Sequence, residues 1–210
     1  IEVPVYGSSD LSSYLKATDN VDGDVTPFIE SDKKLDTSKQ GTQTIEVSVS
    51  DNSGNTTKET YKFFVADMQA PEITLKSGND ITVNYGSEFK WQDYMTIKDN
   101  LDVNVEPQIE GKIDTKQLDQ QTTLTVIVKD SAGNTSKETL NATVKDITGP
   151  EIVLSTNKVS LDKGAQVDLK SYITSAVDNL DGDMKDKITF NAIDTSTTGN
   201  KTVTYTGVDA

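Results

Sequence analysis

The chain has no cysteine, histidine or arginine among its 210 residues. Without cysteine, neither a disulfide nor a thiolate metal ligand can supplement the core. Without histidine, no side chain has its ordinary pKa near neutrality, and without either residue no nucleophile–base pair can form. Without arginine there is no planar bidentate donor for phosphate, and the net charge of −14 repels nucleic acid and anionic membranes. These absences argue against an enzyme and against a nucleic-acid partner.

Long apolar runs are absent as well, since none approaches the roughly 20 residues that a helix needs to cross a bilayer. We therefore expect no membrane insertion. A pair of loop carboxylates such as Asp22 and Asp24 could in principle serve as acid and base. Adjacent loop residues on a convex surface lack a substrate cleft, however, and we predict no catalytic and no cofactor-binding residue.

The chain consists largely of one repeated unit. The Pro-Glu-Ile at residues 71–73 returns at 150–152, and the Gly-Asn-Thr at 54–56 returns at 133–135, in each case 79 positions further on. A period of this length indicates a domain-sized unit in tandem. We predict three repeats: residues 1–67 without a first strand, residues 68–146 complete, and residues 147–210 without a last strand. These boundaries suggest a segment of a longer repetitive protein.

Strand patterns dominate each repeat. Alternating or β-branched stretches predict strands at 44–50, 60–65, 122–128, 138–144 and 202–206, with shorter strands at 81–85 and 159–161. Residues 11–16, 91–95 and 169–173 can hold one short helical turn each. Glycine and asparagine in the intervening clusters favour hairpin turns. Short strands separated by turns over about 79 residues predict an all-β fold of small antiparallel β-sandwiches.

Several motifs occur in a fixed order: Pro-Glu-Ile, then Asp-Asn-x-Asp-Gly-Asp, then Ile-Asp-Thr, then Asp-Ser-Ala-Gly-Asn-Thr. This order resembles the bacterial Ig-like domain of the pesticidal-crystal-protein type, which is related to hyalin-repeat and polycystic-kidney-disease-type Ig-like modules. The resemblance covers the whole chain. It implies tandem Ig-like sandwiches arranged end to end, outside the cell, on secreted or wall-anchored proteins of Gram-positive bacteria.

Two functions follow from the resemblance together with the absences. The first is a non-catalytic structural spacer whose partners are the other domains of the same chain. The alternative is an adhesive module that binds a host protein or a glycan. Trp91 is the only tryptophan. When the repeats are aligned, Leu11 and Leu169 stand near its position, which favours a core position for Trp91 over stacking on a sugar.

The sharpest local feature is an acidic loop, Asp19-Asn20-Val21-Asp22-Gly23-Asp24, repeated at residues 178–183. In the second repeat, at residues 99–104, the loop has lost its glycine and its last carboxylate. Oxygen ligands in this density, with a glycine for the bend, suit Ca²⁺. In an Ig-like sandwich the loop, the hairpin aspartate and the linker aspartate meet at one end. We therefore expect calcium to stiffen the junctions between repeats.

The candidate metal ligands come from all three repeats. They are Asp146, Asp178, Asn179, Asp181, Asp183 and Asp209 around the third acidic loop, Asp67, Asp99, Asp102 and Asp130 around the second, and Asp19, Asp22, Asp24 and Asp51 around the first. We expect the third loop to bind most tightly and the second weakly, while the first lacks a linker ligand. The alternative is that these aspartates only satisfy the backbone of their own turns, as Asx residues commonly do.

Overall fold

The computed structural model describes residues 1–209, which form β-strands and single 3-10 turns. This confirms the all-β prediction, and no helix within the described chain is long and apolar enough to span a membrane. The contacts divide the chain into two compact units. One contains residues 1–74, 96–108 and 126–138, and the other contains residues 75–95, 109–125 and 139–210. The division runs through the second repeat, so the three predicted boundaries stay a prediction.

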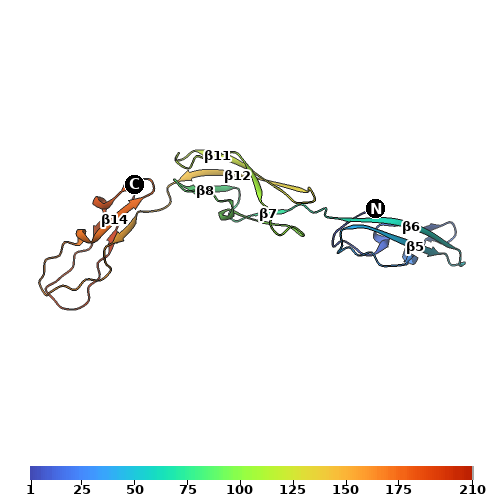
Figure 1. The fold of residues 1–210 in the computed structure, drawn as a ribbon, viewed down its shortest axis with the longest axis horizontal. Helices are drawn as coiled ribbons and strands as arrows, with labels where there is room; N and C mark the ends of the chain where they lie inside the picture. Colours follow the sequence, from blue (N-terminus) through green and yellow to red (C-terminus); the bar gives the residue numbers. More distant parts are fainter. Residues whose placement is uncertain (210) are drawn as a thin grey trace. The chain divides into compact units, whose positions relative to one another are not determined.

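The first repeat is built on a long hairpin. Strands β5 (Gly41–Ser50) and β6 (Thr56–Ala66) pair antiparallel over their full length, from Gly41 opposite Val65 to Ser50 opposite Thr56. Strand β1 (Glu2–Pro4) pairs parallel with β6, and β4 (Glu30–Ser31) adds to β5, which gives the order β1-β6-β5-β4. Figure 1 shows β5 and β6 side by side. The turn between them uses Gly54 at φ 87°, which favours glycine.

The core of the first repeat lies under this sheet, because every second residue of β5 and β6 points inward. Ile45, Phe63 and Val65 are completely buried, and Tyr14 meets the ring of Phe63 edge-on at 6.2 Å. The 3-10 turn η1 (Leu11–Ser13) buries Leu11, and Asp10 caps it by accepting a hydrogen bond from Ser12 N. Strands β2 (Thr18–Asp19) and β3 (Gly23–Asp24) then flank the first acidic loop, and η2 (Thr26–Phe28) follows.

The second repeat has the same four-stranded plan, with a different two-stranded sheet beside it. A sheet of order β10-β11-β12-β8 contains β10 (Pro107–Glu110), β11 (Gln121–Lys129), β12 (Thr135–Lys145) and β8 (Asp80–Asn84). Strand β8 runs parallel to β12, as β1 does to β6. A second sheet pairs β7 (Glu72–Leu75) with β9 (Met95–Lys98), and η3 (Trp91–Asp93) precedes β9.

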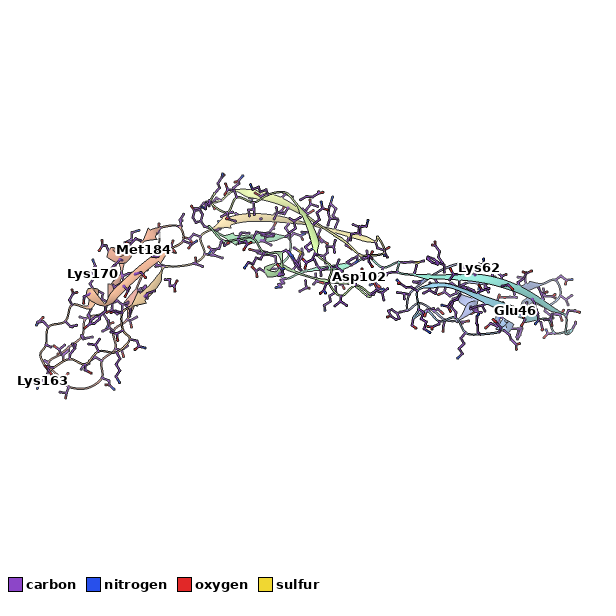
Figure 2. All side chains as sticks on the ribbon, in the orientation of Figure 1. Glu46, Lys62, Asp102, Lys163, Lys170 and Met184 are labelled. Carbon is purple, nitrogen blue, oxygen red and sulfur yellow. The ribbon has the colours of Figure 1, made fainter. Side chains whose placement is uncertain are left out.

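The third repeat has shorter strands. Strand β13 (Glu151–Leu154) pairs antiparallel with β14 (Ile173–Asp178), which also pairs with β15 (Gly182–Asp183). Turns η4 (Leu169–Tyr172) and η5 (Lys185–Lys187) flank this sheet, and β16 (Thr189–Phe190) pairs with β17 (Tyr205–Thr206). The buried residues include Ile173, Ala176 and Met184. Figure 2 labels Met184, which lies close to the strands of this repeat.

Two strand predictions were wrong in the third repeat. Residues 159–161 form no strand, and only Tyr205 and Thr206 of the predicted strand 202–206 are extended in a ladder. In the second repeat the corresponding strand β8 is held by its pairing with β12, and no described strand of the third repeat corresponds to β12. A strand needs a partner for its backbone groups, so the local pattern did not suffice. The three predicted helical turns are confirmed as η1, η3 and η4.

The buried face of β6 yields a paired test. Phe63 is completely buried whereas its neighbour Phe64 is 48% exposed. We expect Phe63→Ala to destabilise the first repeat by about 3–5 kcal/mol, because it leaves a large cavity, and Phe64→Ala to cost about 1 kcal/mol. Urea unfolding of the full chain followed by circular dichroism measures both. Equal losses for the two variants would contradict the assigned inward face.

Candidate metal centres at the repeat junctions

Nine of the predicted ligands gather into three groups of aspartates. Within each group, one carboxylate oxygen from each residue lies within 4.8 Å of the corresponding oxygens of the other two. The first-repeat cluster is Asp19, Asp22 and Asp51; the first-junction cluster is Asp67, Asp99 and Asp130; the second-junction cluster is Asp146, Asp178 and Asp209. Each cluster belongs to one compact unit. The first-junction cluster combines a linker, an acidic loop and a hairpin, as the sequence analysis expected, and the second combines a linker, an acidic loop and Asp209, which follows strand β17 (Tyr205–Thr206).

The acidic loops share one turn. In each, an oxygen of the first aspartate accepts hydrogen bonds from the backbone N–H groups two and three residues later. For Asp19 the distances are 2.8 Å to Val21 N and 2.9 Å to Asp22 N, and for Asp178 they are 2.8 Å to Leu180 N and 2.8 Å to Asp181 N. These N–H groups lower the pKa of Asp19 and of Asp178, so both are ionised at neutral pH.

The glycine of the motif has a visible role. Gly23 and Gly182 adopt φ values of 75° and 70°, and each begins the strand that closes its loop. In the second repeat Val103 stands at this position, is 92% exposed, and no equivalent strand follows within the described residues. A β-branched residue disfavours positive φ. The second acidic loop therefore loses its closing strand pair, although Asp99 Oδ1 still accepts from Leu101 N and Asp102 N at 2.9 Å each.

The second aspartate of the motif ties the loop to the neighbouring hairpin. Asp22 accepts hydrogen bonds from Asn52 N and Asn52 Nδ2, both at 2.8 Å. Asp102, labelled in Figure 2, accepts from Ser131 N at 2.6 Å and from Ser131 Oγ at 3.0 Å. Its counterpart Asp181 lies 3.7 Å from Lys187 Nζ. The structure therefore places Asp102 and Asp181 outside the clusters that sequence reasoning assigned to them.

The last carboxylate of the motif also lies outside the clusters. Asp24 accepts from Thr26 N at 2.9 Å and Asp183 accepts from Lys185 N at 3.0 Å, so each holds the turn that follows its loop. The hydroxyl and backbone N–H of Thr26 lower the pKa of Asp24. Sequence spacing could not separate this role from metal ligation.

The hairpin aspartates keep the turn role as well as their place in the clusters. Asp51 accepts from Asn55 N at 2.7 Å and from Asn55 Nδ2 at 2.6 Å. Asp130, 6% exposed, accepts from Gly133 N at 2.6 Å and from Asn134 N and Nδ2 at 2.7 Å each. The turn-former alternative therefore describes part of what these residues do. Turn formation alone does not explain why each of these aspartates lies beside two further carboxylates.

The first junction is held by side-chain amides. Asn100 Nδ2 donates to the carboxylate of Asp67 at 3.2 Å, and Asn134 Nδ2 donates to the carbonyl oxygens of Asp67 and Gln69 at 3.3 Å each. Leu101, in the second acidic loop, packs against the core of the first repeat. The corresponding residue of the first loop, Val21, is 83% exposed. The second acidic loop is thus part of the joint between the first two repeats.

The second junction uses the same asparagine of the motif. Asn179 Nδ2 donates to the carbonyl oxygen of Tyr85 at 2.8 Å, and Asn179 Oδ1 accepts from Thr148 Oγ1 at 2.7 Å. Asn84 Nδ2 donates to Thr148 Oγ1 at 3.1 Å, and its Oδ1 accepts from Ile147 N at 3.2 Å. Asn179 was predicted as a metal ligand, but in the structure its side-chain amide links the acidic loop to Thr148 and Tyr85. We call this pair of hydrogen bonds the asparagine strut. Sequence reasoning missed Asn84 and Thr148, because neither belongs to a repeated acidic motif.

Four buried side-chain oxygens in the described chain have no hydrogen-bond partner. They are Asp99 Oδ2 and Asn100 Oδ1 at the first junction, and Asp146 Oδ2 and Asp178 Oδ2 at the second. Asp178 is only 4% exposed. Buried polar atoms in folded proteins nearly always have a partner. The concentration of these four at the two junctions sets those clusters apart from the half-buried first-repeat cluster.

One comparison with known proteins bears on identity. Residues 73–144, almost the whole second repeat, match the family described as bacterial surface protein, Ig-like domain. The match supports a bacterial Ig-like domain. The all-β sheets of the repeat agree with it. The pesticidal-crystal-protein type and the repetition of this domain along the chain stay predictions, since the match covers one repeat. A search of curated proteins gave no match.

The asparagine strut at the second junction can be tested against its counterpart in the first repeat. Asn179→Ala removes the hydrogen bonds to Tyr85 and Thr148, whereas Asn20 holds the same motif position and is exposed. We expect hydrogen exchange of the amides at 146–149 to rise about fivefold or more in Asn179→Ala, since each hydrogen bond contributes about 1 kcal/mol. Asn20→Ala should leave that exchange unchanged. Mass spectrometry of the full chain measures it, and unchanged exchange in both variants would refute the strut.

Proposed function

We propose that the chain is a non-catalytic spacer of a bacterial surface protein, made of Ig-like sandwiches in series with junctions stiffened by bound calcium. The observation that carries this proposal is the common construction of the two junctions. At the first junction the asparagine of the acidic loop bonds to Asp67 in the linker. At the second, Asn179 bonds to Thr148 in the linker and to Tyr85 just after strand β8. Residues 67–71 and 146–150 are short connections pinned in this way. A short connection held by hydrogen bonds in this way favours restricted rotation between neighbouring repeats, which suits a spacer.

The carboxylates argue for a non-catalytic module. A general acid of a glycosidase needs a pKa raised toward neutrality. In the pair considered from sequence, Thr26 lowers the pKa of Asp24, and both oxygens of Asp22 accept hydrogen bonds from Asn52. The family matched by the second repeat is named for bacterial surface proteins. Together these observations support a structural role outside the cell over an enzymatic one, and the proposed setting is a secreted or wall-anchored protein of a Gram-positive bacterium.

The adhesive alternative has less support. Trp91, the side chain best suited to stack on a sugar, is only partly exposed and begins the turn η3. Binding to a host protein or a glycan stays a prediction that direct binding assays can test.

Small-angle X-ray scattering of the full chain tests the spacer proposal. A compact protein of 210 residues has a radius of gyration of about 17 Å. A spacer must exceed this clearly, and its distance distribution must carry a long tail. A radius near the compact value in calcium-containing buffer would contradict the proposal, because repeats folded back on one another provide no reach.

A further inference from the structure

We propose that the second-junction cluster, Asp146, Asp178 and Asp209, is a calcium site, and that the first-junction cluster, Asp67, Asp99 and Asp130, is a weaker second one. The inference rests on the proposed spacer function in that it names the ligand that stiffens the joints. It concerns the two junction clusters and not the first-repeat cluster.

The oxygen geometry suits a single ion. The three carboxylates at each junction present oxygens within 4.8 Å of one another. Oxygens bound to one Ca²⁺ at 2.3–2.6 Å can be no more than about 5 Å apart, so the observed spacing is that of ligands around a shared centre. Each ligand comes from a different segment: a linker, an acidic loop, and either the hairpin of the second repeat or the residues after β17. An ion at this point would cross-link the end of one repeat to the loops of the next.

The unpartnered oxygens point to a missing partner that is positively charged. Asp178 is 4% exposed, and its Oδ1 takes the backbone hydrogen bonds of the turn while Oδ2 has none. Asp146 Oδ2, in the same cluster, is likewise buried and unpartnered. Burying polar side-chain oxygens without a partner is unfavourable, and a cation held between them would supply that partner.

The lysines close by are engaged with other carboxylates. Lys187 lies 3.7 Å from Asp181, and Lys145 lies 3.3 Å from Asp119. Side-chain amines therefore do not take the place of a cation in this cluster.

The donor set favours calcium over other metals. Zinc and the later transition metals prefer nitrogen and sulfur ligands, and this chain has neither histidine nor cysteine. Mg²⁺ demands near-octahedral geometry at shorter distances and retains several waters. Ca²⁺ accepts irregular shells of six to eight oxygens, which three carboxylates and water can supply.

The structure also ranks the sites. At the first junction, both oxygens of Asp130 and one of Asp67 already accept hydrogen bonds from neighbouring amides, and Val103 replaces the glycine that closes the other loops. These competing bonds weaken the site, although Asp99 Oδ2 and Asn100 Oδ1 remain unpartnered there. The first-repeat cluster contains no linker aspartate and no buried unpartnered oxygen among the described residues.

The test is calorimetry and thermal unfolding of the full chain in calcium and in chelator, with two isosteric variants. Asp178→Asn keeps the acceptor of the turn and places an N–H₂ group where Oδ2 meets the other carboxylates. Asp183→Asn removes the same charge from the same loop, at an exposed residue bonded to Lys185 and outside the cluster. Asp146→Asn provides a second loss variant in the linker, where Asp146 Oδ1 accepts only a long hydrogen bond of 3.5 Å from Thr148 N.

We expect the wild-type chain to bind two Ca²⁺ at submillimolar to millimolar concentration with a rise in unfolding temperature, and Mg²⁺ to bind more weakly. Asp178→Asn and Asp146→Asn should each lose one bound ion, while Asp183→Asn keeps both. In chelator, Asp146→Asn should unfold within a few degrees of wild type, because Asp146 makes only one long hydrogen bond to the backbone. Loss of a bound ion without loss of the apo fold separates a metal ligand from a residue that merely supports the fold.

Three results would overturn the inference. They are the absence of heat and thermal shift in millimolar calcium, an equal loss of bound ions in Asp183→Asn and Asp178→Asn, and a strong destabilisation of Asp146→Asn in chelator. Scattering on the same samples keeps the two proposals apart. An extended chain that ignores calcium leaves the spacer standing without this site, whereas a compact chain that binds two ions leaves the site standing without the spacer.

Discussion

The hydrogen bonds of one aspartate in each acidic loop organise the ends of these repeats. Asp19, Asp99 and Asp178 each fold the following residues into a turn by accepting two backbone N–H groups on one oxygen. The turn fixes where the next residue of the motif points. At the two junctions that residue is an asparagine, and its amide reaches the preceding linker or strand end. Without the turn, neither the strut nor the cluster of carboxylates would form.

The two junctions hold their linkers in place with different contacts. At the first, an apolar contact from Leu101 to the core of the first repeat accompanies the amide of Asn100. At the second, Asn84, Thr148 and Asn179 form a hydrogen-bonded network around the linker. Both leave carboxylate oxygens buried and unpartnered at the centre. The recurrence of this arrangement with different surroundings suggests that the buried charge itself is what the joint requires.

Much of the fold was predictable because strands and turns here follow local rules. The alternation in residues 44–50 and the glycines of the hairpins located β5 and its turn, and the aspartates that would gather were found from the repeat alone. The strand at 159–161 was not predictable, because its existence depends on a partner strand rather than on its own pattern. The roles of Asp24, Asp102 and Asp183 were also beyond sequence reasoning. An aspartate that holds its own turn and one that faces a cluster look identical in a motif.

Calcium occupancy of the junctions is the central claim, and a crystal structure of the chain grown with calcium tests it most directly. We expect anomalous density from calcium inside both junction clusters. At the second junction it should lie about 2.3–2.6 Å from oxygens of Asp146, Asp178 and Asp209. Lower occupancy at Asp67, Asp99 and Asp130 would agree with the expected ranking. Density confined to Asp19, Asp22 and Asp51, or none at either junction in millimolar calcium, would contradict it.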